Sequence, residues 1–252
     1  MASAGVPRGF AAGADAAAHA FTAALDDAVV VDGPDGRHLE RVRRLRVGER
    51  VTLADGAGHW RPYRIVGTGK ARLDVEADGP TREEPGLTPR LAVAFGIGKG
   101  AKPEQVVSGL TELGVDRIVP FLSARSVVRW DGDRAATAGE RLRRVAREAA
   151  MQCRRSRLPE VGDPVGIDGL VTDGVVVVGD PAGTAAIDLA PPKGGEWLAV
   201  VGAEGGLAPE ERAALEAGSG AVGLAVGPHV LRTETAAVAV AAVLAARRAV
   251  GH

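Results

Sequence analysis

The N-terminal part of the chain carries short apolar runs separated by glycine turns. Four such runs are present, at 29–31, 50–55, 59–66 and 71–77. Short strands at this spacing predict a small β-barrel. After the first run, Leu39, Val42 and Leu45 recur at helical spacing, with their apolar side chains facing inward. The arginine-rich segment that begins at Arg37 is therefore predicted to form one helix that interrupts the strands.

A segment without apolar periodicity, GPTREEPGLTP at 79–89, combines prolines, glycines and charges and is typical of a linker. We place the domain boundary there and expect domains at 1–80 and 81–252. Beyond it, apolar runs typical of strands occur at 91–95, 117–121, 175–179, 197–202 and 221–227. Helical patterns begin near Lys102, extend over 139–153, begin near Pro209 and extend over 233–248. This alternation predicts an α/β domain with a mainly parallel sheet.

Bulk composition narrows the class of protein. The chain has 252 residues, enough to fold without disulfides, and Cys153 is its single cysteine. A lone cysteine fits a reducing compartment. The N-terminus lacks the pattern of an export signal, and no run of about 20 apolar residues is free of charge. We expect a cytoplasmic protein without membrane spans.

Charge is unevenly distributed although the formal net charge is only -1. Arginines gather in the segments 37–50 and 141–157, where few acidic residues accompany them. Local basic surface on a neutral protein is the pattern expected of a selective phosphate-backbone contact. The alternative is that these arginines only solvate exposed helix faces.

Glycines follow three predicted strands, at Gly179, Gly202 and Gly227. In parallel sheets the carboxyl ends of strands are where ligands bind, and glycine lets backbone approach a ligand closely. The three loops are predicted to line one crevice for a nucleotide-like ligand. The alternative is that each glycine only makes a tight turn.

Other kinds of site lack their motifs. The segment 201–206 does not fit the dinucleotide-binding spacing, and GIGKG at 96–100 supplies only part of such a fingerprint. A phosphate-binding loop and a nucleophile elbow are also missing from the sequence. The five histidines show no metal-ligand spacing, and no metal is expected.

Five stretches, the last of them a pair of segments, resemble one known family in their order along the chain. They are VPRGF at 6–10, HLERVRRLRVGE at 38–49, KGAKPEQVVSGLTELGVDRIVPFLSARSVV at 99–128, REAAMQCRRSRLPEV at 147–161, and the C-terminal pair of VGAEGGLAPEE at 201–211 and VGPHVLRTETAAVAV at 226–240. Together they resemble the 16S rRNA uridine N3-methyltransferases, members of the SPOUT class. The resemblance extends over most of the chain.

This resemblance implies a fold and an activity. The fold is a PUA-like RNA-binding β-barrel followed by a SPOUT methyltransferase domain with a deep trefoil knot, one of the rare exceptions to unthreaded chains. The cofactor is S-adenosylmethionine (SAM), and the family is homodimeric through the knotted domain. The implied substrate is the uridine at position 1498 of 16S rRNA, in the small ribosomal subunit.

Carried onto matching positions, the resemblance places the cofactor against three segments, largely through backbone. The residues are Asp180, Pro181, Val201, Gly202, Glu204, Gly205, Gly206, Leu224, Val226, Gly227, Leu231, Arg232 and Thr233.

Methylation of uracil N3 requires loss of a weakly acidic proton and stabilisation of the resulting negative charge. By hypothesis Arg8 and Arg232 stabilise that charge or position the base, and Glu204 accepts the proton or fixes the glycine loop. The alternative for Arg232, beside Glu234 at the start of a helix, is a structural ion pair or cap.

RNA contacts are expected from arginines at or beside the family motifs. These are Arg125, Arg154 and Arg157 on the large domain, and Arg8, Arg41 and Arg44 near the N-terminus. Trp60, Trp130 and Trp197 could stack on bases, or could instead lie in the core.

The chain departs from the family pattern at four positions, Gly109, Met151, Ala203 and His229. None of these departures replaces a glycine of the two C-terminal segments.

Two other functions fit the same motifs: a non-catalytic rRNA-binding assembly factor, and a related knotted methyltransferase acting on another RNA.

Overall fold

The computed structural model describes residues 13, 15–43, 45–97, 103–126, 132–185, 192 and 195–250. The chain divides into two compact units. A small unit takes in the residues up to Gly86 together with Arg147–Leu158, and a large unit takes in Leu87–Ala146 and the chain from Pro159 onward. Residues 147–158 therefore belong to the small unit although the large unit precedes and follows them in sequence.

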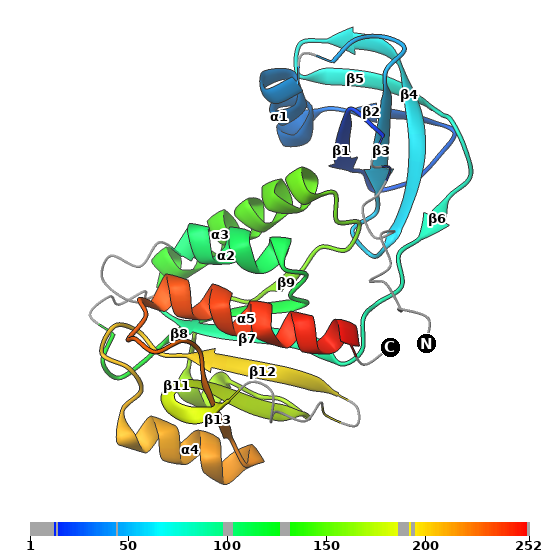
Figure 1. Ribbon diagram of the computed structural model, residues 1–252. Helices are drawn as coiled ribbons and strands as arrows, with labels where there is room; N and C mark the ends of the chain where they lie inside the picture. The colour runs from blue at the N-terminus through cyan, green and yellow to red at the C-terminus, as the bar shows by residue number, and fades with distance from the viewer. Residues whose placement is uncertain are drawn as a thin grey trace, which may run out of the picture. The chain divides into compact units, whose positions relative to one another are not determined.

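The small unit is a mixed sheet with one helix (Figure 1). Its elements are β1 (Ala18–Phe21), β2 (Ala28–Val31), α1 (Gly33–Arg43), β3 (Arg50–Ala54), β4 (His59–Gly69), β5 (Arg72–Ala77) and β6 (Arg82–Glu83). The strand order is β1-β3-β4-β5-β2, with β6 paired to β4. β1 runs parallel to β3, whereas the other neighbours are antiparallel. The structure thus confirms the four predicted strands and adds β1 and β6.

The core of the small unit is completed by residues 147–158. Leu53, Tyr63 and Ile65 are fully buried at its centre, and Ala150 and Met151 pack into the same cluster. Arg147 donates to both carboxylate oxygens of Asp35 at 2.6 and 3.1 Å. Its guanidinium carbon also lies 4.9 Å from the centre of the Phe21 ring. This part of the predicted arginine cluster therefore holds the small unit together.

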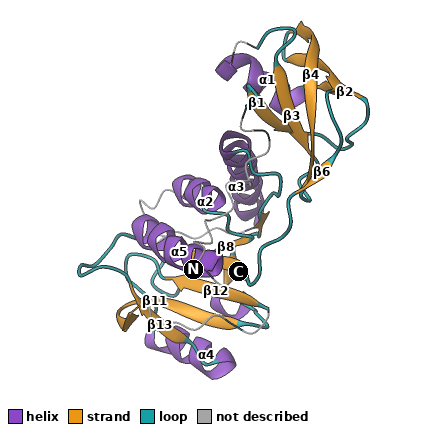
Figure 2. Ribbon diagram, turned by 45° about the vertical axis from the view of Figure 1, so that its right-hand side comes forward, coloured by secondary structure: helices purple, strands orange, loops and turns teal. Residues whose placement is uncertain are grey.

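The large unit is built on a parallel sheet of seven strands (Figure 2). The strands are β7 (Arg90–Gly96), β8 (Arg117–Leu122), β9 (Glu160–Val161), β10 (Val165–Gly166), β11 (Val175–Ala185), β12 (Glu196–Val201) and β13 (Val222–Ala225). The helices are α2 (Pro103–Glu112), α3 (Gly132–Cys153), a short 3-10 turn (Ile167–Gly169), α4 (Pro209–Ser219) and α5 (Thr233–Val250). The order β10-β8-β7-β12-β11-β13, with β9 beside β8, confirms the predicted α/β class and parallel sheet.

Helices cover both faces of this sheet because its strands are apolar on both sides. Leu91, Val93 and Phe95 of β7 belong to the cluster that contains the buried residues of α2 and α5. Ala92 and Ala94 face the other way and join a cluster that includes Leu215 of α4. Figures 1 and 2 show α2 and α5 on one face and α4 on the other.

Several predicted boundaries are wrong. α3 begins at Gly132 rather than 139, because its first turns lack the apolar stripe on which the prediction relied. α1 spans 33–43 and leaves Leu45 outside the helix. β11 does not end at Gly179 but continues to Ala185 beyond an irregularity in its pairing with β13. β13 ends at Ala225, and Gly227 adopts a left-handed φ of 74°.

The C-terminal helix is tied to the sheet by a buried ion pair. Arg248 Nη1 lies 2.6 Å from Asp116 Oδ2, and Arg248 Nη2 donates to the Gly114 carbonyl at 2.8 Å. Among the described helices, none is long and apolar enough to cross a membrane.

His19 is a buried, hydrogen-bonded side chain of the small unit. Its Nδ1 lies 2.8 Å from Thr52 Oγ1, and its Nε2 lies 3.2 Å from the Arg155 carbonyl oxygen. Burial is the main reason that the pKa of His19 falls to about 4, and the charge of Arg154 acts in the same direction. The ring is therefore neutral at neutral pH, with Nε2 donating to the carbonyl, which can only accept.

We predict an acid-sensitive contribution of His19 to stability. The unfolded chain binds a proton near its ordinary pKa of about 6.5, but the folded chain does so only near 4. Stability from the neutral ring is therefore complete above about pH 6.5 and is lost as the pH falls towards about 4. Urea titrations at about pH 7.5 and about pH 5 give the drop in unfolding free energy between these two pH values. This drop should be about 2 kcal/mol larger for the wild type than for His19→Gln. Parallel losses in the two proteins would contradict the prediction.

Candidate cofactor site

A cavity of about 370 Å³ opens in the large unit beside the carboxyl end of β12, the part of β11 where its pairing becomes irregular, and the chain that follows β13. Three separate segments form it: 178–181, 201–207 and 224–233. Arg212 of α4 and two residues of α5, Ala236 and Val240, complete the lining. The three glycine-bearing segments predicted to meet at one crevice therefore do line it, although residues 178–181 belong to β11 and Gly227 is not among the lining residues.

Most residues predicted to hold the cofactor line this cavity. They are Asp180, Pro181, Val201, Gly202, Glu204, Gly205, Gly206, Leu224, Val226, Leu231 and Thr233. Gly227 and Arg232 are not among the lining residues. Gly227 instead provides the left-handed turn that ends β13, and Arg232 has an exposed side chain just before α5.

The sequence analysis missed other lining residues. They are Val178, Leu207, Arg212, Ala236 and Val240, whereas Gly179, Ala203, His229 and Val230 also line the cavity and lie in segments already predicted to form it. The spacing of Thr233, Ala236 and Val240 places them on one face of α5, so helical periodicity could have identified the last two. Arg212 carried no such signal, because it resembles the other arginines of an exposed helix face.

Backbone crowding explains the glycines of the segment 201–206. A side chain on Gly202 would place its Cβ 2.8 Å from the carbonyl carbon of Gly206, where no flexible group could move aside. Gly206 has a left-handed φ of 67°, which other residues rarely adopt. The turn is closed by a hydrogen bond from the Gly206 N–H to the Ala203 carbonyl at 2.7 Å. The wall of the cavity at this point is therefore mostly main chain.

Side chains from two other segments brace this glycine turn. Arg125 Nη1 donates to the Gly205 carbonyl at 2.7 Å, and Thr233 Oγ1 donates to the Gly202 carbonyl at 3.2 Å. In the structure the Arg125 guanidinium contacts the turn, and its predicted RNA contact stays a prediction. Its side chain remains exposed.

Glu211 ties the start of α4 to the segment that carries Arg125. Its Oε2 accepts from the Ala208 N–H, and its Oε1 accepts from the Ala124 N–H, both at 2.7 Å. Glu211 is 6% exposed, so both bonds act on a desolvated carboxylate and are charge-assisted. The sequence showed Glu211 only as part of the motif after the glycines, and its partner Ala124 is distant in sequence.

Charged groups lie at one side of the cavity. Asp180 Oδ2 lies 2.6 Å from Arg212 Nη1. A hydrogen bond from the Ala182 N–H lowers the pKa of Asp180, and Arg212 lowers it further. Glu204 also lines the cavity and is exposed.

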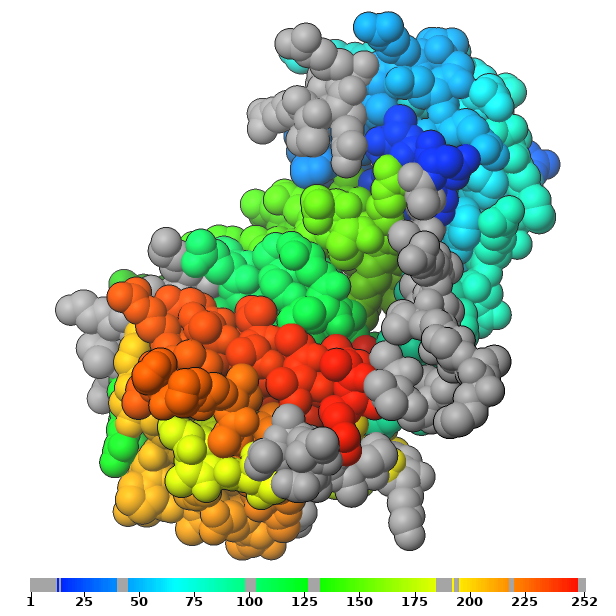
Figure 3. Space-filling view, in the orientation of Figure 1, coloured from blue at the N-terminus to red at the C-terminus, as the bar shows by residue number. Residues whose placement is uncertain are grey.

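At the mouth of the cavity, residues 227–230 are exposed, Val230 at 88%, and the loop before α5 lies at the surface in Figure 3.

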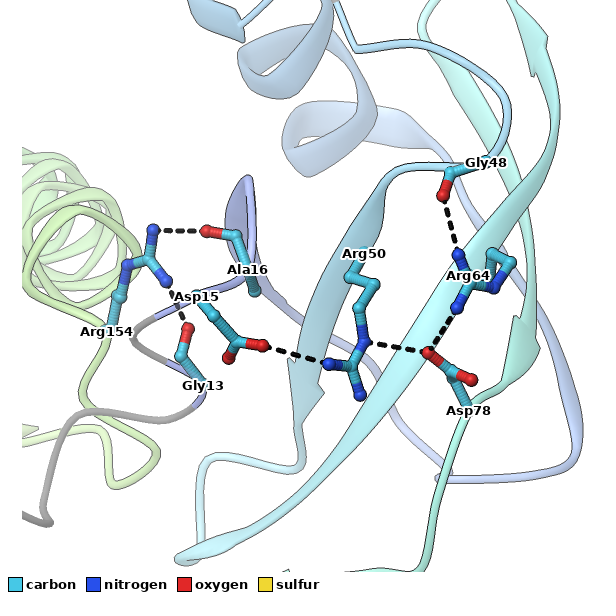
Figure 4. Close-up of polar contacts among 8 residues, drawn as sticks. All are labelled: Gly13, Asp15, Ala16, Gly48, Arg50, Arg64, Asp78 and Arg154. Carbon is cyan, nitrogen blue, oxygen red and sulfur yellow. Dashed lines mark hydrogen bonds and ion pairs between the residues drawn. The ribbon is translucent and has the colours of Figure 1, made fainter.

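The remaining predicted RNA contacts lie outside the cavity. Arg154 has a left-handed φ of 61°, and its guanidinium donates to the carbonyls of Gly13 and Ala16 (Figure 4). Arg157 Nε donates to the Glu84 carbonyl at 3.0 Å. Both arginines therefore hold segments of the small unit, and charge reversal there would disturb its fold as well as any RNA contact. Arg8, Arg44 and the side chain of Arg41 lie outside the described residues.

The predicted alternatives for the tryptophans are partly resolved. Trp197 is fully buried in β12 and cannot stack on a base. Trp60 is partly buried, and the guanidinium carbon of Arg82 lies over its ring, 5.1 Å from the ring centre. Trp130 lies outside the described residues. In the described part of the chain, no group of His, Cys, Asp and Glu could hold a metal ion.

Comparison with known families gives two matches that together span most of the chain. Residues 86–245 match the model of the RNA methyltransferase domain, and residues 31–78 match that of the RNA methyltransferase PUA domain. A ribosomal RNA small subunit methyltransferase E of Mycobacterium bovis is 38% identical over 218 residues, which cover 82% of each chain.

Two solved structures resemble the whole fold. A ribosomal RNA small subunit methyltransferase E of Neisseria gonorrhoeae bound to SAM is 28% identical, with a TM-score of 0.77, over 90% of this chain and 96% of that one. A putative methyltransferase of Legionella pneumophila with bound SAM is 27% identical, with a TM-score of 0.79, over 91% and 97%. SAM is thus the cofactor that this cavity is expected to hold.

We predict that Gly202→Ala raises the dissociation constant for SAM by about tenfold or more. The new methyl group would displace the turn that forms the cavity wall. Isothermal titration calorimetry measures the effect. Gly86→Ala is the matched control, since a Cβ at Gly86 meets nothing within 4 Å, and it should bind SAM like the wild type. Equal affinity in Gly202→Ala and Gly86→Ala would refute the role of the turn.

Proposed function

The chain belongs to the ribosomal RNA small subunit methyltransferase E family, a family of SAM-dependent enzymes, and from this membership we propose that it methylates N3 of a uridine in 16S rRNA. The observation that carries the proposal is the cavity formed by the glycine turn after β12, the irregular part of β11 and the chain between β13 and α5. It lies inside the region that matches the methyltransferase domain.

The cavity suits the proposed cofactor in size and chemistry. About 370 Å³ lies within the range of small-molecule sites. Val201, Leu224 and Leu231 offer apolar surface for a purine ring and a ribose, and the loops at 202–206 and 179–181 bring backbone groups to the lining. Backbone N–H and carbonyl groups can pair with an adenine edge without any side chain. These residues are the ones proposed to hold SAM.

Bound SAM supplies an electrophilic methyl group next to a sulfonium leaving group. The chain must then hold the uracil N3 in line with that methyl group and accept the N3 proton. We assign proton acceptance to Glu204, because this carboxylate lines the cavity and is exposed at the glycine turn. The uracil nitrogen gains the methyl group, the carbon–sulfur bond breaks, and the proton leaves through the carboxylate.

Positive charge near the base would stabilise the negative charge that develops on the uracil ring. Arg232 immediately precedes α5, and its side chain is exposed with no hydrogen bond or ion pair to the other described residues. It is therefore available to a substrate, although it does not line the cofactor cavity itself. Arg8 is proposed for the same task on the resemblance alone.

RNA binding is proposed for the small unit and for free arginines of the large one. A second cavity, of about 120 Å³, lies in the small unit beside Arg50, Trp60 and Arg82. Arg50 is paired with Asp15 and Asp78, but Arg82 lies over the partly exposed Trp60 ring, and an aromatic ring beside an arginine suits an unpaired base and its phosphate. Arg144 of α3 is exposed and makes no ion pair with the described residues, so it can contact phosphate.

The trefoil knot and the homodimer belong to the same proposal. β13 pairs with β11, and the following chain returns to the glycine turn through Thr233 and Gly202, which brings the C-terminal segment against both earlier loops. The homodimer is proposed on the resemblance alone.

Nucleoside analysis of 16S rRNA tests the proposed reaction. We expect a strain that lacks this gene to lose N3-methyluridine from its 16S rRNA. The wild-type gene should restore the modification, and the Gly202→Ala gene should not. Unchanged N3-methyluridine in the deletion strain would rule out the proposed target and leave a related RNA or a non-catalytic assembly role.

A substitution at Glu204 separates proton acceptance from a role in shaping the turn. If Glu204 accepts the proton, Glu204→Gln should lower kcat by roughly a hundredfold or more while the dissociation constant for SAM stays within about threefold. Single-turnover methylation and calorimetry on the same preparation provide the two values. Weakened SAM binding with an unchanged rate at saturation would show that Glu204 only supports the loop.

A further inference from the structure

One wall of the cofactor cavity carries an ion pair that the proposed reaction does not use. Arg212 of α4 places its Nη1 2.6 Å from Asp180 Oδ2, at the point where β11 leaves its regular pairing. Its Nε lies 3.0 Å from Glu216 Oε1, one turn further along the same helix. Arg212 and Asp180 both line the cavity, whereas Glu216 does not. The guanidinium is therefore held between two carboxylates at the edge of the site.

Both members of the pair retain capacity for a ligand. Arg212 uses Nη1 and Nε, and its Nη2 makes no hydrogen bond or ion pair with the described residues. Its side chain is 44% exposed. Asp180 accepts from the Ala182 N–H at 2.9 Å and from Arg212, yet a carboxylate offers about four lone-pair positions. The wall thus presents an available donor and an available acceptor side by side.

This arrangement fits a zwitterion better than a nucleoside. An adenosine group carries no formal charge and suits the apolar and backbone surfaces of the remaining lining. The amino-acid end of SAM carries an α-ammonium and an α-carboxylate on one carbon atom, which match a carboxylate and a guanidinium that already lie together. An anionic phosphate would gain from Arg212 but would be repelled by Asp180 and Glu216, which disfavours an RNA phosphate at this wall.

We propose that Asp180 and Arg212 bind the amino-acid end of SAM, with the α-ammonium donating to Asp180 and the α-carboxylate accepting from Arg212. The assignment rests on the proposed placement of SAM in this cavity. It gives Arg212, a residue outside the family motifs quoted above, a role in cofactor recognition.

Two ligands that differ only at this end provide the test. S-adenosylhomocysteine carries the amino-acid group, and 5′-methylthioadenosine ends in a methyl group at the same sulfur. In calorimetric titrations, Arg212→Leu should weaken S-adenosylhomocysteine and SAM roughly ten- to a hundredfold, the range of a charge-assisted hydrogen bond. Methylthioadenosine should change by less than about threefold.

Matched variants exclude indirect effects. Glu216→Gln removes the outer partner of Arg212 without touching the cavity lining and should leave all three affinities within about threefold. Arg212→Lys keeps a cation and should recover part of the lost affinity. If Arg212→Leu does not fold, Asp180→Asn tests the same wall from the other side and should also discriminate against the two ligands that carry the amino-acid group.

The outcomes separate this inference from the proposed function. Equal weakening of all three ligands by Arg212→Leu would mean that the arginine only shapes the cavity, and unchanged affinities would mean that it takes no part in binding. Either result overturns the inference while leaving the cofactor site in place. If the wild type binds none of the three ligands, the proposed cofactor site itself is wrong.

Discussion

Backbone packing at the carboxyl edge of the parallel sheet is the constraint on which the cavity depends. All six residues of β12 are buried, and the strand is bonded to β7 on one side and β11 on the other. The chain must therefore leave the sheet at Gly202 and turn at once, in a space that admits no side chain at that residue. A wall made of main chain offers hydrogen-bonding groups at fixed positions, but it cannot be rebuilt by repacking side chains.

The polar residues around this turn show how the fold and the site depend on each other. Glu211 satisfies two backbone N–H groups, and Arg125 and Thr233 satisfy two carbonyls of the turn. They come from α4, from the segment after β8 and from α5, so all three regions must be in place before the cavity exists. These residues act on the shape of the site, whereas Glu204 and Arg232 are exposed and are the residues proposed to act on the substrate.

Arginine serves several purposes in this chain that its composition cannot distinguish. Arg147 pairs with Asp35, and Arg154 and Arg157 hold backbone carbonyls of the small unit. Arg248 is buried against Asp116, whereas Arg212 faces the cofactor cavity. The clusters first interpreted as a phosphate-binding surface are thus partly structural. The arginines whose guanidinium groups are exposed and unpaired among the described residues, such as Arg144, are the ones that the proposed RNA contact can use.

The sequence by itself determined the α/β class, most strands and helices, and the meeting of three glycine-bearing segments at one crevice. Each of these follows from local periodicity or from the rule that parallel strands end at the same edge. Only the tertiary structure decided the early start of α3, the continuation of β11 past Gly179, and the roles of Glu211 and Arg212. These depend on partners far away in the chain, such as Ala124 for Glu211 and Asp180 for Arg212, and no local pattern encodes which distant group a side chain meets.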